Sequence, residues 1–480
     1  MIKLYNTFTR RKEEFKPLVE GRLGIYVCGP TVYGMPHLGH AKSYINFDTI
    51  IRFFKFMGYK VKYVQNITDV GHLVGDSDDG EDKIARQAKI EKLDAYEIAY
   101  KYEIEYFKAM DKLNVQRPSI SCRATGFVYD MIETVKDIIA KGYGYVTPQG
   151  NVYFDVRKYQ KYGQLSNRKL ENNMSGERIE VADDKRNPED FALWKSVGSG
   201  ALMQWQSPWG NGCPGWHIEC TTLGKKFLGE RFDIHGGGID NVFPHHECEC
   251  AQADVVNGHL PMNYFMHNGL VTVNGTKMGK SLGNSITLTE LFEKYGPMPI
   301  RYFVEQFHYR SAVDISDEGL MLASKQFNKL KENVNLVRNV TLEKKDITDP
   351  ELKSIYQAFV DAMSEDFNTP LAIVELNKIN KIINASLNDV EKLKEINKFI
   401  SDLAESVLGL DFGEVVKLEK KDDIPDNVKQ LASKRWEAKL NKNWAEADSL
   451  REELKSLGYA INDRKDGYDI EKIWLWLIRF

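Results

Sequence analysis

The sequence predicts an α/β fold built on a parallel sheet, with an insertion in the sheet domain and helices after it. Near the N-terminus, strand-like apolar runs alternate with helix-like segments, which is typical of parallel strands joined by crossover helices. The alternation is interrupted, resumes, and then gives way to an almost wholly helical sequence. We therefore expect two halves of a sheet domain, an insertion, a helical bundle and a small C-terminal domain, at residues 1–115 and 216–314, 116–215, 315–417 and 427–480.

The opening of the chain has the pattern strand, loop, helix, strand. LGIYVCG suits a buried strand, and Gly29 and Pro30 end it in a loop. From His37 to Met57 the apolar residues recur at helical spacing, and Gly58 suits a C-terminal cap. KVKYVQNI then predicts a second strand. This order places the loop at the carboxyl end of the first strand, where open α/β sheets bind ligands.

The middle of the chain contains the insertion and the return to the sheet. A helical stretch from Phe127 to Ala140 leads into short strand-like pieces such as GNVYFDV. ERFDIHGGGID then predicts a strand followed by a glycine loop. LVTVNGTKMGK predicts a tight hairpin, because Asn274-Gly275 suits a type I′ turn.

The last third is helical. Thr369-Pro370 predicts a helix start with a capping hydroxyl. The apolar stripe expected behind it comprises Leu371, Val374, Ile379, Ile382 and Ile383. The charge-rich segment 418–427 predicts a linker. The final helical region has one apolar face, formed by Leu440, Trp444, Ala447, Leu450, Leu454 and Leu457.

Composition limits the class of protein. The 480 residues are 28% charged and 42% hydrophobic, which is globular, and no apolar run is long enough for a transmembrane helix. Six cysteines in a chain of this length are not a disulfide framework, so we expect a reducing, cytoplasmic location without a membrane partner. The net charge of −4 excludes a uniformly basic nucleic-acid binder but not a basic face.

Two short segments suit a nucleotide phosphate. His37 and His40 lie one turn apart at a helix start, where imidazoles and helix amides can stabilise charge on a phosphate. Lys277 and Lys280 lie three residues apart in a glycine-containing loop that can close over a triphosphate. Taken alone, the histidine segment is explained equally well by a pair of ordinary surface histidines, and the lysine segment is explained better by an ordinary surface loop.

Together, PHLGH and KMGKS resemble the HIGH and KMSKS signatures of class I aminoacyl-tRNA synthetases. Further stretches resemble the cysteinyl-tRNA synthetase family: YVCGPTVYGMPHLGHAKSYINFD, FALWKS, SPWGNGCPGWHIEC, FDIHGGGIDNVFPHHE, HYRS, DFNTP and ADSLREELKSLG. The resemblance covers nearly the whole chain. It implies a Rossmann-type catalytic domain with an inserted connective polypeptide, followed by a helical tRNA-binding bundle and an anticodon-binding domain.

The resemblance also implies one zinc ion in the amino-acid pocket, held by Cys28, Cys220, His245 and Glu249. Spacing agrees in part, because His245 and Glu249 share a helix face. By spacing alone His217 with Cys220, or His246 with Cys250, would serve equally well, and Cys213 is a further thiol nearby. For Cys122, Cys248 and Cys250 we expect packing roles.

Other roles follow from the same resemblance. His37, His40, Lys277 and Lys280 would act on the phosphates of ATP with Mg²⁺, and Gly238 and Asp240 would bind adenosine. Trp216, with Cys28, would contact the amino acid. The implied partners are L-cysteine, ATP and tRNA(Cys), with a monomer expected. In the anticodon-binding region, Arg435, Lys439, Trp436 and Trp444 would offer charge and stacking surfaces to RNA. For Arg435 and Lys439 ordinary solvated charge is an equal expectation, and for Trp444 core packing is the stronger one.

The implied activity is that of a cysteine–tRNA ligase, in which zinc–thiolate coordination selects cysteine over serine. Three departures from the family pattern bear on this expectation: Gly279 replaces a serine in the lysine loop, and Cys213 and Cys248 add thiols near the metal site. Two alternatives are a cysteine ligase acting on an amino-sugar, which lacks the C-terminal helical region, and a non-catalytic paralogue, which would be free to lose the signature residues.

Overall fold

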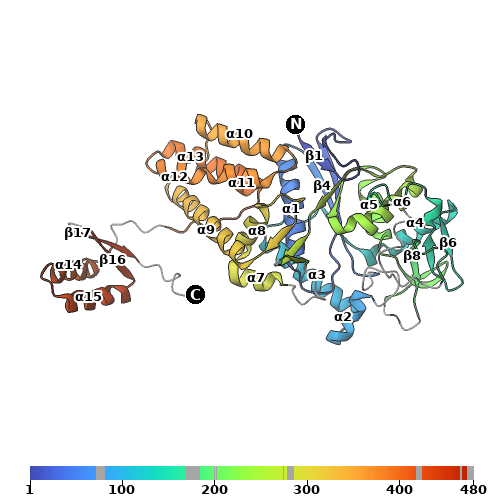
Figure 1. Cartoon of the computed structure of the whole chain (residues 1–480), viewed down its shortest axis with the longest axis horizontal. Coiled ribbons are helices and arrows are strands. Elements are labelled where there is room, and N and C mark those ends of the chain that lie inside the picture. The colour runs from blue at the N-terminus through green and yellow to red at the C-terminus, as the bar shows by residue number, and fades with distance from the viewer. Residues whose placement is uncertain are drawn as a thin grey trace. The chain divides into compact units, whose positions relative to one another are not determined.

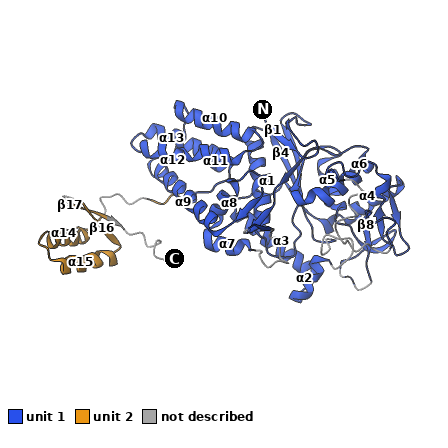
Figure 2. Cartoon of the chain, viewed as in Figure 1, with its two compact units in different colours: residues 1–414 blue, residues 415–480 orange. Residues whose placement is uncertain are grey.

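The computed structural model describes residues 1–71, 82–168, 184–198, 201, 203–273, 275–277, 286–417, 424–464 and 467–472. The chain divides into two compact units, Met1–Glu414 and Val415–Phe480 (Figure 2). Lys280, Gly279, Asn274, the stretch 72–81, the linker residues 418–423 and the apolar C-terminal residues 473–480 lie outside the described residues. Among the described helices, none is both long and apolar enough to cross a membrane.

A parallel sheet forms the centre of the first unit. Its described strands have the order β12-β11-β3-β4-β5, and each neighbouring pair is parallel. The bounds are β3 Arg22–Val27, β4 Lys60–Ile67, β5 Ile120–Arg123, β11 Phe232–Gly238 and β12 Met262–Asn268. The predicted α/β class is confirmed. The glycine loop predicted after the strand is wrong in one respect, because the three glycines Gly236 to Gly238 belong to strand β11 itself.

Helix α1 (Leu38–Phe56) follows β3, close to the predicted bounds. His37 caps it: its Nδ1 accepts a hydrogen bond from the Gly39 amide, and the His40 side chain accepts one from the His37 amide. Both signature histidines therefore lie at the start of a helix that the sheet and the helical region bury. Four more helices occur in the sequence between strands of this sheet: α2 (Lys83–Glu91), α3 (Ala95–Lys112), α5 (Ile218–Leu228) and α6 (Glu247–Asn257).

The insertion carries its own antiparallel sheet, with strand order β6-β7-β8-β10-β9. These strands are β6 Gly144–Val146, β7 Val152–Phe154, β8 Phe191–Ser196, β9 Trp205–Ser207 and β10 Gly210–Pro214, beside α4 (Val128–Ala140). At the N-terminus, β1 (Lys3–Asn6) and β2 (Arg11–Glu14) form a hairpin. The predicted hairpin near 275 is present as β13 (Val271–Val273) and β14 (Thr276–Lys277), and β13 also pairs in parallel with β15 (Val313–Ile315).

The helices after the sheet lie on one side of α1, and the insertion lies on the other side (Figure 1). They are α7 Leu288–Tyr295, α8 Pro297–Glu305, α9 Asp317–Val340, α10 Pro350–Ser364, α11 Thr369–Asn377, α12 Ile379–Ala385, α13 Val390–Phe399 and the π-helical η8 Ile400–Val407. The fully buried Arg301 of α8 ties them to α1, because its guanidinium contacts Asp48 at 2.6 Å and the Leu408 carbonyl at 2.6 Å.

Two expectations about the helical region are wrong. Leu371 and Val374 are 54% and 56% exposed, because α11 buries the face that carries Ala372, Ile373 and Leu376 instead. The cap of α11 is Asn368, whose Oδ1 accepts from the Leu371 amide, whereas the Thr369 hydroxyl donates to the Phe307 carbonyl. A tertiary contact thus takes the hydroxyl that the local pattern assigned to capping.

The second unit is a small α/β piece. It contains α14 (Asp426–Leu440), α15 (Trp444–Ser456) and the antiparallel strands β16 (Tyr459–Arg464) and β17 (Gly467–Lys472). Ala447 and Leu454 face its core as predicted. Leu440, Trp444 and Leu457 are 64%, 59% and 44% exposed, so the predicted apolar face is only partly buried and the packing role expected for Trp444 is wrong.

Candidate active site

A buried cluster of Cys, His and Glu side chains lies where the sheet order reverses direction. Strand β3 has β4 on one side and β11 on the other, and ligands of open α/β sheets bind at the carboxyl ends of strands at such a point. Cys28 follows β3 directly, Cys220 comes from α5, His245 from the π-helical turn Val242–His246, and Glu249 from α6. All four side chains are buried.

Glycines in β11 let the surrounding elements approach the cluster. A Cβ atom on Gly236 would lie 2.3 Å from the ring of Phe47 on α1. A Cβ atom on Gly237 would lie 2.9 Å from the ring of His246. Side chains at these positions would displace α1 or the histidine turn, so the packing of the site requires glycine at both positions.

The ligand atoms of the four side chains lie within 4.8 Å of one another. Cys28 Sγ is 3.8 Å from Cys220 Sγ, Cys220 Sγ is 3.5 Å from His245 Nε2, and His245 Nε2 is 2.9 Å from Glu249 Oε1. A tetrahedral ion with bonds of about 2.3 Å to sulfur and about 2.0 Å to nitrogen separates two sulfurs by about 3.8 Å and sulfur from nitrogen by about 3.5 Å. The donor set and its spacing therefore fit zinc.

Burial and charge set the protonation of these groups. Burial raises the pKa of the Cys28 and Cys220 thiols. Burial alone would lower the pKa of His245, but Glu249 and Cys220 outweigh it and raise this pKa to about 10. Burial likewise opposes ionisation of Glu249, yet His235 and His245 lower its pKa to about 2. The cluster thus contains an imidazolium–carboxylate pair beside two thiols, and a cation bound there would displace the imidazolium proton.

Two further histidines, His235 and His246, contact members of the cluster. His235 of β11 contacts Glu249 Oε2 through Nε2 at 2.8 Å, and its Nδ1 lies 3.2 Å from the Tyr26 carbonyl. His246 Nε2 is 3.1 Å from Cys28 Sγ, so Cys28, His235, His246 and Glu249 form a second possible ligand group that shares two members with the first. Sequence patterns did not single out His235, although a histidine within an apolar strand was an available signal.

The remaining residues considered for the metal do not join the ligand groups. His217 Nδ1 contacts His245 Nδ1 at 2.9 Å, and neither His217 nor Cys250 belongs to a possible ligand group of the described residues. Cys122 of β5 and Cys250 of α6 pack in one hydrophobic core, and Cys213 of β10 and Cys248 of α6 pack in another, which contains most of the buried residues of the insertion. The packing roles expected for Cys122, Cys248 and Cys250 agree with this burial.

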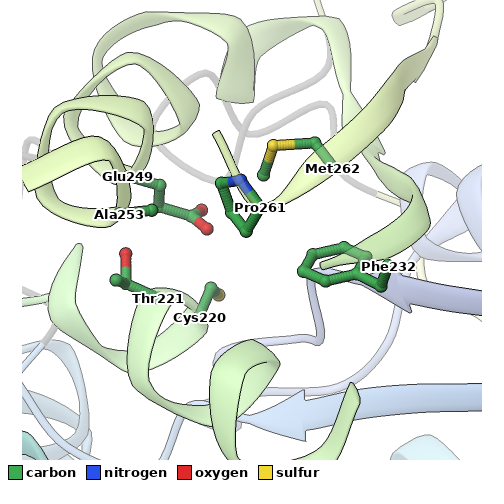
Figure 3. Close-up of a pocket in the computed structure, with 7 residues that line it drawn as sticks. All are labelled: Cys220, Thr221, Phe232, Glu249, Ala253, Pro261 and Met262. Carbon is green, nitrogen blue, oxygen red and sulfur yellow. The ribbon is translucent and has the colours of Figure 1, made fainter. Parts of the chain in front are cut away.

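The surroundings of the cluster define the space next to it. The Trp216 ring stacks on His245 with centroids 4.3 Å apart. A small cavity of about 10 Å³ lies between α5 and α6, and Cys220 and Glu249 point toward it (Figure 3). That volume holds about one water molecule, so this cavity is too small for an amino acid.

The segment that follows the lysine loop is joined to the first signature through the backbone. The rings of His37 and His40 stack with centroids 4.0 Å apart, and both side chains are half-buried. The Leu288 amide donates to the Pro36 carbonyl at 2.9 Å, and His37 and Thr287 form an isolated β-bridge. The chain that follows the lysine loop is thus attached to the first signature.

The structure places the other predicted nucleotide residues less completely. Lys277 ends β14, but its side chain and all of Lys280 lie outside the described residues. Gly238 ends β11, and Asp240 is exposed in the short helix Ile239–Asn241. Gly238 and Asp240 lie close together, because a Cβ atom on Gly238 would be 2.4 Å from Asp240 Oδ1.

In the second unit, the basic residues considered for RNA contact make internal ion pairs. Asp463 of β16 pairs with Arg435, with Lys439 Nζ at 2.8 Å and with Arg451 at 3.3 Å. The Lys439 ammonium also lies over the Trp436 ring, 5.0 Å from its centroid. Arg435 is 3% exposed, so its role within this unit is structural.

Three known families each match a successive part of the chain. Residues 14–326 match the family of tRNA synthetases class I (C) catalytic domain, 358–413 the DALR domain, and 421–469 the cysteinyl-tRNA ligase anticodon binding domain. The cysteine–tRNA ligase of Bacteroides fragilis is 46% identical over 98% of both chains. The chain belongs to the cysteinyl-tRNA synthetase family.

Other relatives agree with this family. The cysteine–tRNA ligase of Chlorobium chlorochromatii is 44% identical over 97% of this chain and 98% of its own. Among solved structures, a Mycobacterium tuberculosis methionyl-tRNA synthetase in complex with methionyl-adenylate superposes with a TM-score of 0.57 at 14% identity, over 81% of this chain and 92% of its own. A LeuRS of Agrobacterium radiobacter gives 0.58 at 11% identity, over 82% and 85%. These two likenesses show a shared fold.

Proposed function

We propose that this chain is a cysteine–tRNA ligase. It activates L-cysteine with ATP to form cysteinyl-adenylate and pyrophosphate, and then transfers the cysteinyl group to the 3′ end of tRNA(Cys). Membership of the family supports the reaction class. One observation supports cysteine as the amino-acid substrate. It is the buried group of Cys28, Cys220, His245 and Glu249, whose donor atoms suit a metal ion that prefers thiolate ligands.

Cys28, Cys220, His245 and Glu249 would hold one zinc ion, which supplies a Lewis acid that binds thiolate far better than hydroxyl. Hydrophobic pockets separate close analogues by only about 1–3 kcal/mol, so a pocket without such a donor set would discriminate cysteine from serine poorly. His235 holds Glu249 in place by its 2.8 Å contact, and Trp216, stacked on His245, forms a wall beside the cluster.

The chain's own residues would do the rest of the activation by positioning and electrostatics. His37 and His40, at the N-terminus of α1, stabilise negative charge on the α-phosphate as the cysteine carboxylate attacks it. Lys277 and Lys280 neutralise the β- and γ-phosphates, and Mg²⁺ arrives with ATP. Gly238 and Asp240 bind the adenosine, with the exposed Asp240 carboxylate accepting from the ribose hydroxyls.

We propose that the later parts of the chain bind tRNA(Cys). In this division, 1–115 and 216–314 form the catalytic domain around the insertion 116–215, 315–417 contacts the tRNA bend, and 427–480 binds the anticodon. The match of 421–469 to an anticodon-binding family supports the last assignment. Because Arg435 is engaged by Asp463, RNA contact there falls to exposed groups such as Trp444.

The test is charging of unfractionated tRNA with labelled cysteine by the zinc-loaded protein, with labelled serine as the control. We expect cysteine-specific charging that periodate oxidation of the tRNA ends abolishes. Cysteine-dependent ATP–pyrophosphate exchange without charging would instead indicate ligation to a small acceptor such as an amino-sugar. Loss of both activities would contradict the proposal and indicate a non-catalytic paralogue.

A further inference from the structure

A lysine ammonium is buried on the helix that carries the signature histidines. Lys42 of α1 is 1% exposed, and its Nζ donates to the Gly269 carbonyl at 2.7 Å and the Tyr309 carbonyl at 3.2 Å. Among the residues that the structure describes, no carboxylate pairs with it. Burial lowers the pKa of Lys42 to about 8, which reflects the loss of water without a compensating charge.

Stability does not explain this ammonium. An ion moved out of water without a counter-ion loses several kcal/mol of solvation, and apolar replacements of buried ions are often neutral or stabilising. Both carbonyls also have another donor: Asn268 Nδ2 donates to the Gly269 carbonyl at 3.2 Å, and the Gly269 amide donates to the Tyr309 carbonyl at 2.8 Å. The backbone would stay hydrogen-bonded without Lys42.

The two carbonyls lie just before the starts of two neighbouring strands. Gly269 lies just before β13 and Tyr309 shortly before β15, and β13 and β15 pair in parallel. The segments touch closely, because a Cβ atom on Gly269 would lie 2.4 Å from the Ser311 carbonyl. Strand β13 turns into β14, which ends at Lys277.

A second contact from α1 reaches the same place. The Ser43 hydroxyl donates to Asn268 Oδ1 at 2.9 Å. Lys42 and Ser43 are consecutive, and Lys42 follows His40 by two residues. One short segment of α1 therefore carries a signature histidine and holds the base of the hairpin that leads into the lysine loop.

We propose that Lys42 is a positioning residue: its ammonium fixes the β13–β14 hairpin, and with it Lys277, relative to His37 and His40. The inference rests on the proposed function, because it concerns the relative placement of the two segments that would bind ATP. It adds to the family signatures a buried group that contacts neither nucleotide nor amino acid.

The test is Lys42→Met, which keeps an unbranched side chain and removes the charge. In ATP–pyrophosphate exchange we expect kcat to fall at least about ten-fold while KM for cysteine stays within about two-fold, since the metal cluster is untouched. The Tm should be unchanged or higher, for the reasons of solvation given above. Lys42→Arg, which retains a cationic donor, should recover most of kcat.

Lys55→Met is the matched control, because Lys55 is an exposed lysine of the same helix. It should behave as wild type. Wild-type kcat in K42M would overturn the proposal. A lowered Tm together with changes in kcat, in KM for cysteine and in KM for ATP would also overturn it. So would failure of K42M to fold, since either result would make the role of Lys42 structural.

Hydrogen exchange separates this inference from the proposed function. Amides of β13 should exchange at least about ten-fold faster in K42M than in wild type, and those of β4 should not change. Absence of ATP–pyrophosphate exchange in the wild-type protein would contradict the proposed function. Unchanged hydrogen exchange of the β13 amides in K42M would overturn the positioning role alone.

Discussion

Two clusters of ionisable side chains, one in each unit, differ in their contact with water. The first gathers Cys28, Cys220, His245 and Glu249, each at most 9% exposed. The second gathers Arg435, Lys439 and Arg451 around Asp463, and their side chains are 4%, 29%, 46% and 23% exposed, in that order. Both bring ionisable groups to one point, but only the first does so in the absence of solvent.

The consequence is a different use of charge. In the buried cluster, opposing effects of burial and neighbouring charge move the pKa of His245 up to about 10 and that of Glu249 down to about 2. In the second cluster, the hydrogen bond from Arg435 lowers the pKa of Asp463 by direct pairing, with water nearby. Buried ionisable groups that have no water to solvate them suit ligand binding, whereas ion pairs screened by solvent mainly stabilise a small domain.

The largest effect is expected from Cys220→Ser. Loss of a metal-binding thiol should lower cysteine-dependent ATP–pyrophosphate exchange by more than about 100-fold, since changes to the outer partners of a metal ligand already reduce metal affinity or activity by about 10–100-fold. Bound zinc, measured by elemental analysis, should fall in parallel.

Cys122→Ser is its matched control. Cys122 is a buried thiol of β5 that donates to the Gln65 carbonyl and lies outside the possible ligand groups. We expect its activity and zinc content to stay close to wild type. Full zinc content in C220S would contradict the ligand assignment.

A smaller effect is expected from Arg435→Ala in the second cluster. The guanidinium is almost fully buried and its partner is partly exposed, so the second unit should lose about 2 kcal/mol of stability, less than for a wholly buried pair. Hydrogen exchange of α14 and α15 in the full chain measures this loss. Arg451→Ala removes a half-exposed partner of the same carboxylate and should cost less than about 0.5 kcal/mol. Equal effects of the two variants would show that burial does not decide the strength of these pairs.

The smallest effect is the pH dependence of the second cluster. Because the pKa of Asp463 is lower in the folded than in the unfolded chain, the stability it contributes is complete above about pH 5 and is lost as pH falls further. Solvent limits this contribution to about 1 kcal/mol or less. Exchange of α14 and α15, corrected for the intrinsic effect of pH, should show the loss in wild type but not in Asp463→Asn. The same loss in both proteins would assign it to another group.

Local patterns in the sequence predicted those parts of the fold that local physics controls. The apolar runs that became β3 and β4 and the helical spacing of α1 were sufficient, because a buried strand or helix imposes its period on the residues it contains. The first signature was located correctly at a helix start, and the hairpin predicted before the second is present. Leu371 and Trp444 show the limit: each fits an apolar period, yet the neighbouring elements leave both exposed.

By itself, the sequence determined the class of fold, the strand–loop–helix–strand opening, the position of the first signature and, through resemblance, a predicted ligand set. Spacing alone left several pairs of cysteine and histidine equally eligible. Only the tertiary structure decided which thiols meet, because Cys28 and Cys220 are 192 residues apart and are brought to 3.8 Å by the parallel pairing of β3 with β11 and the packing of α5 beside it. It also placed Lys42 under the hairpin and Arg435 against Asp463. Such contacts join side chains far apart in the chain, and local periodicity carries no record of that distance.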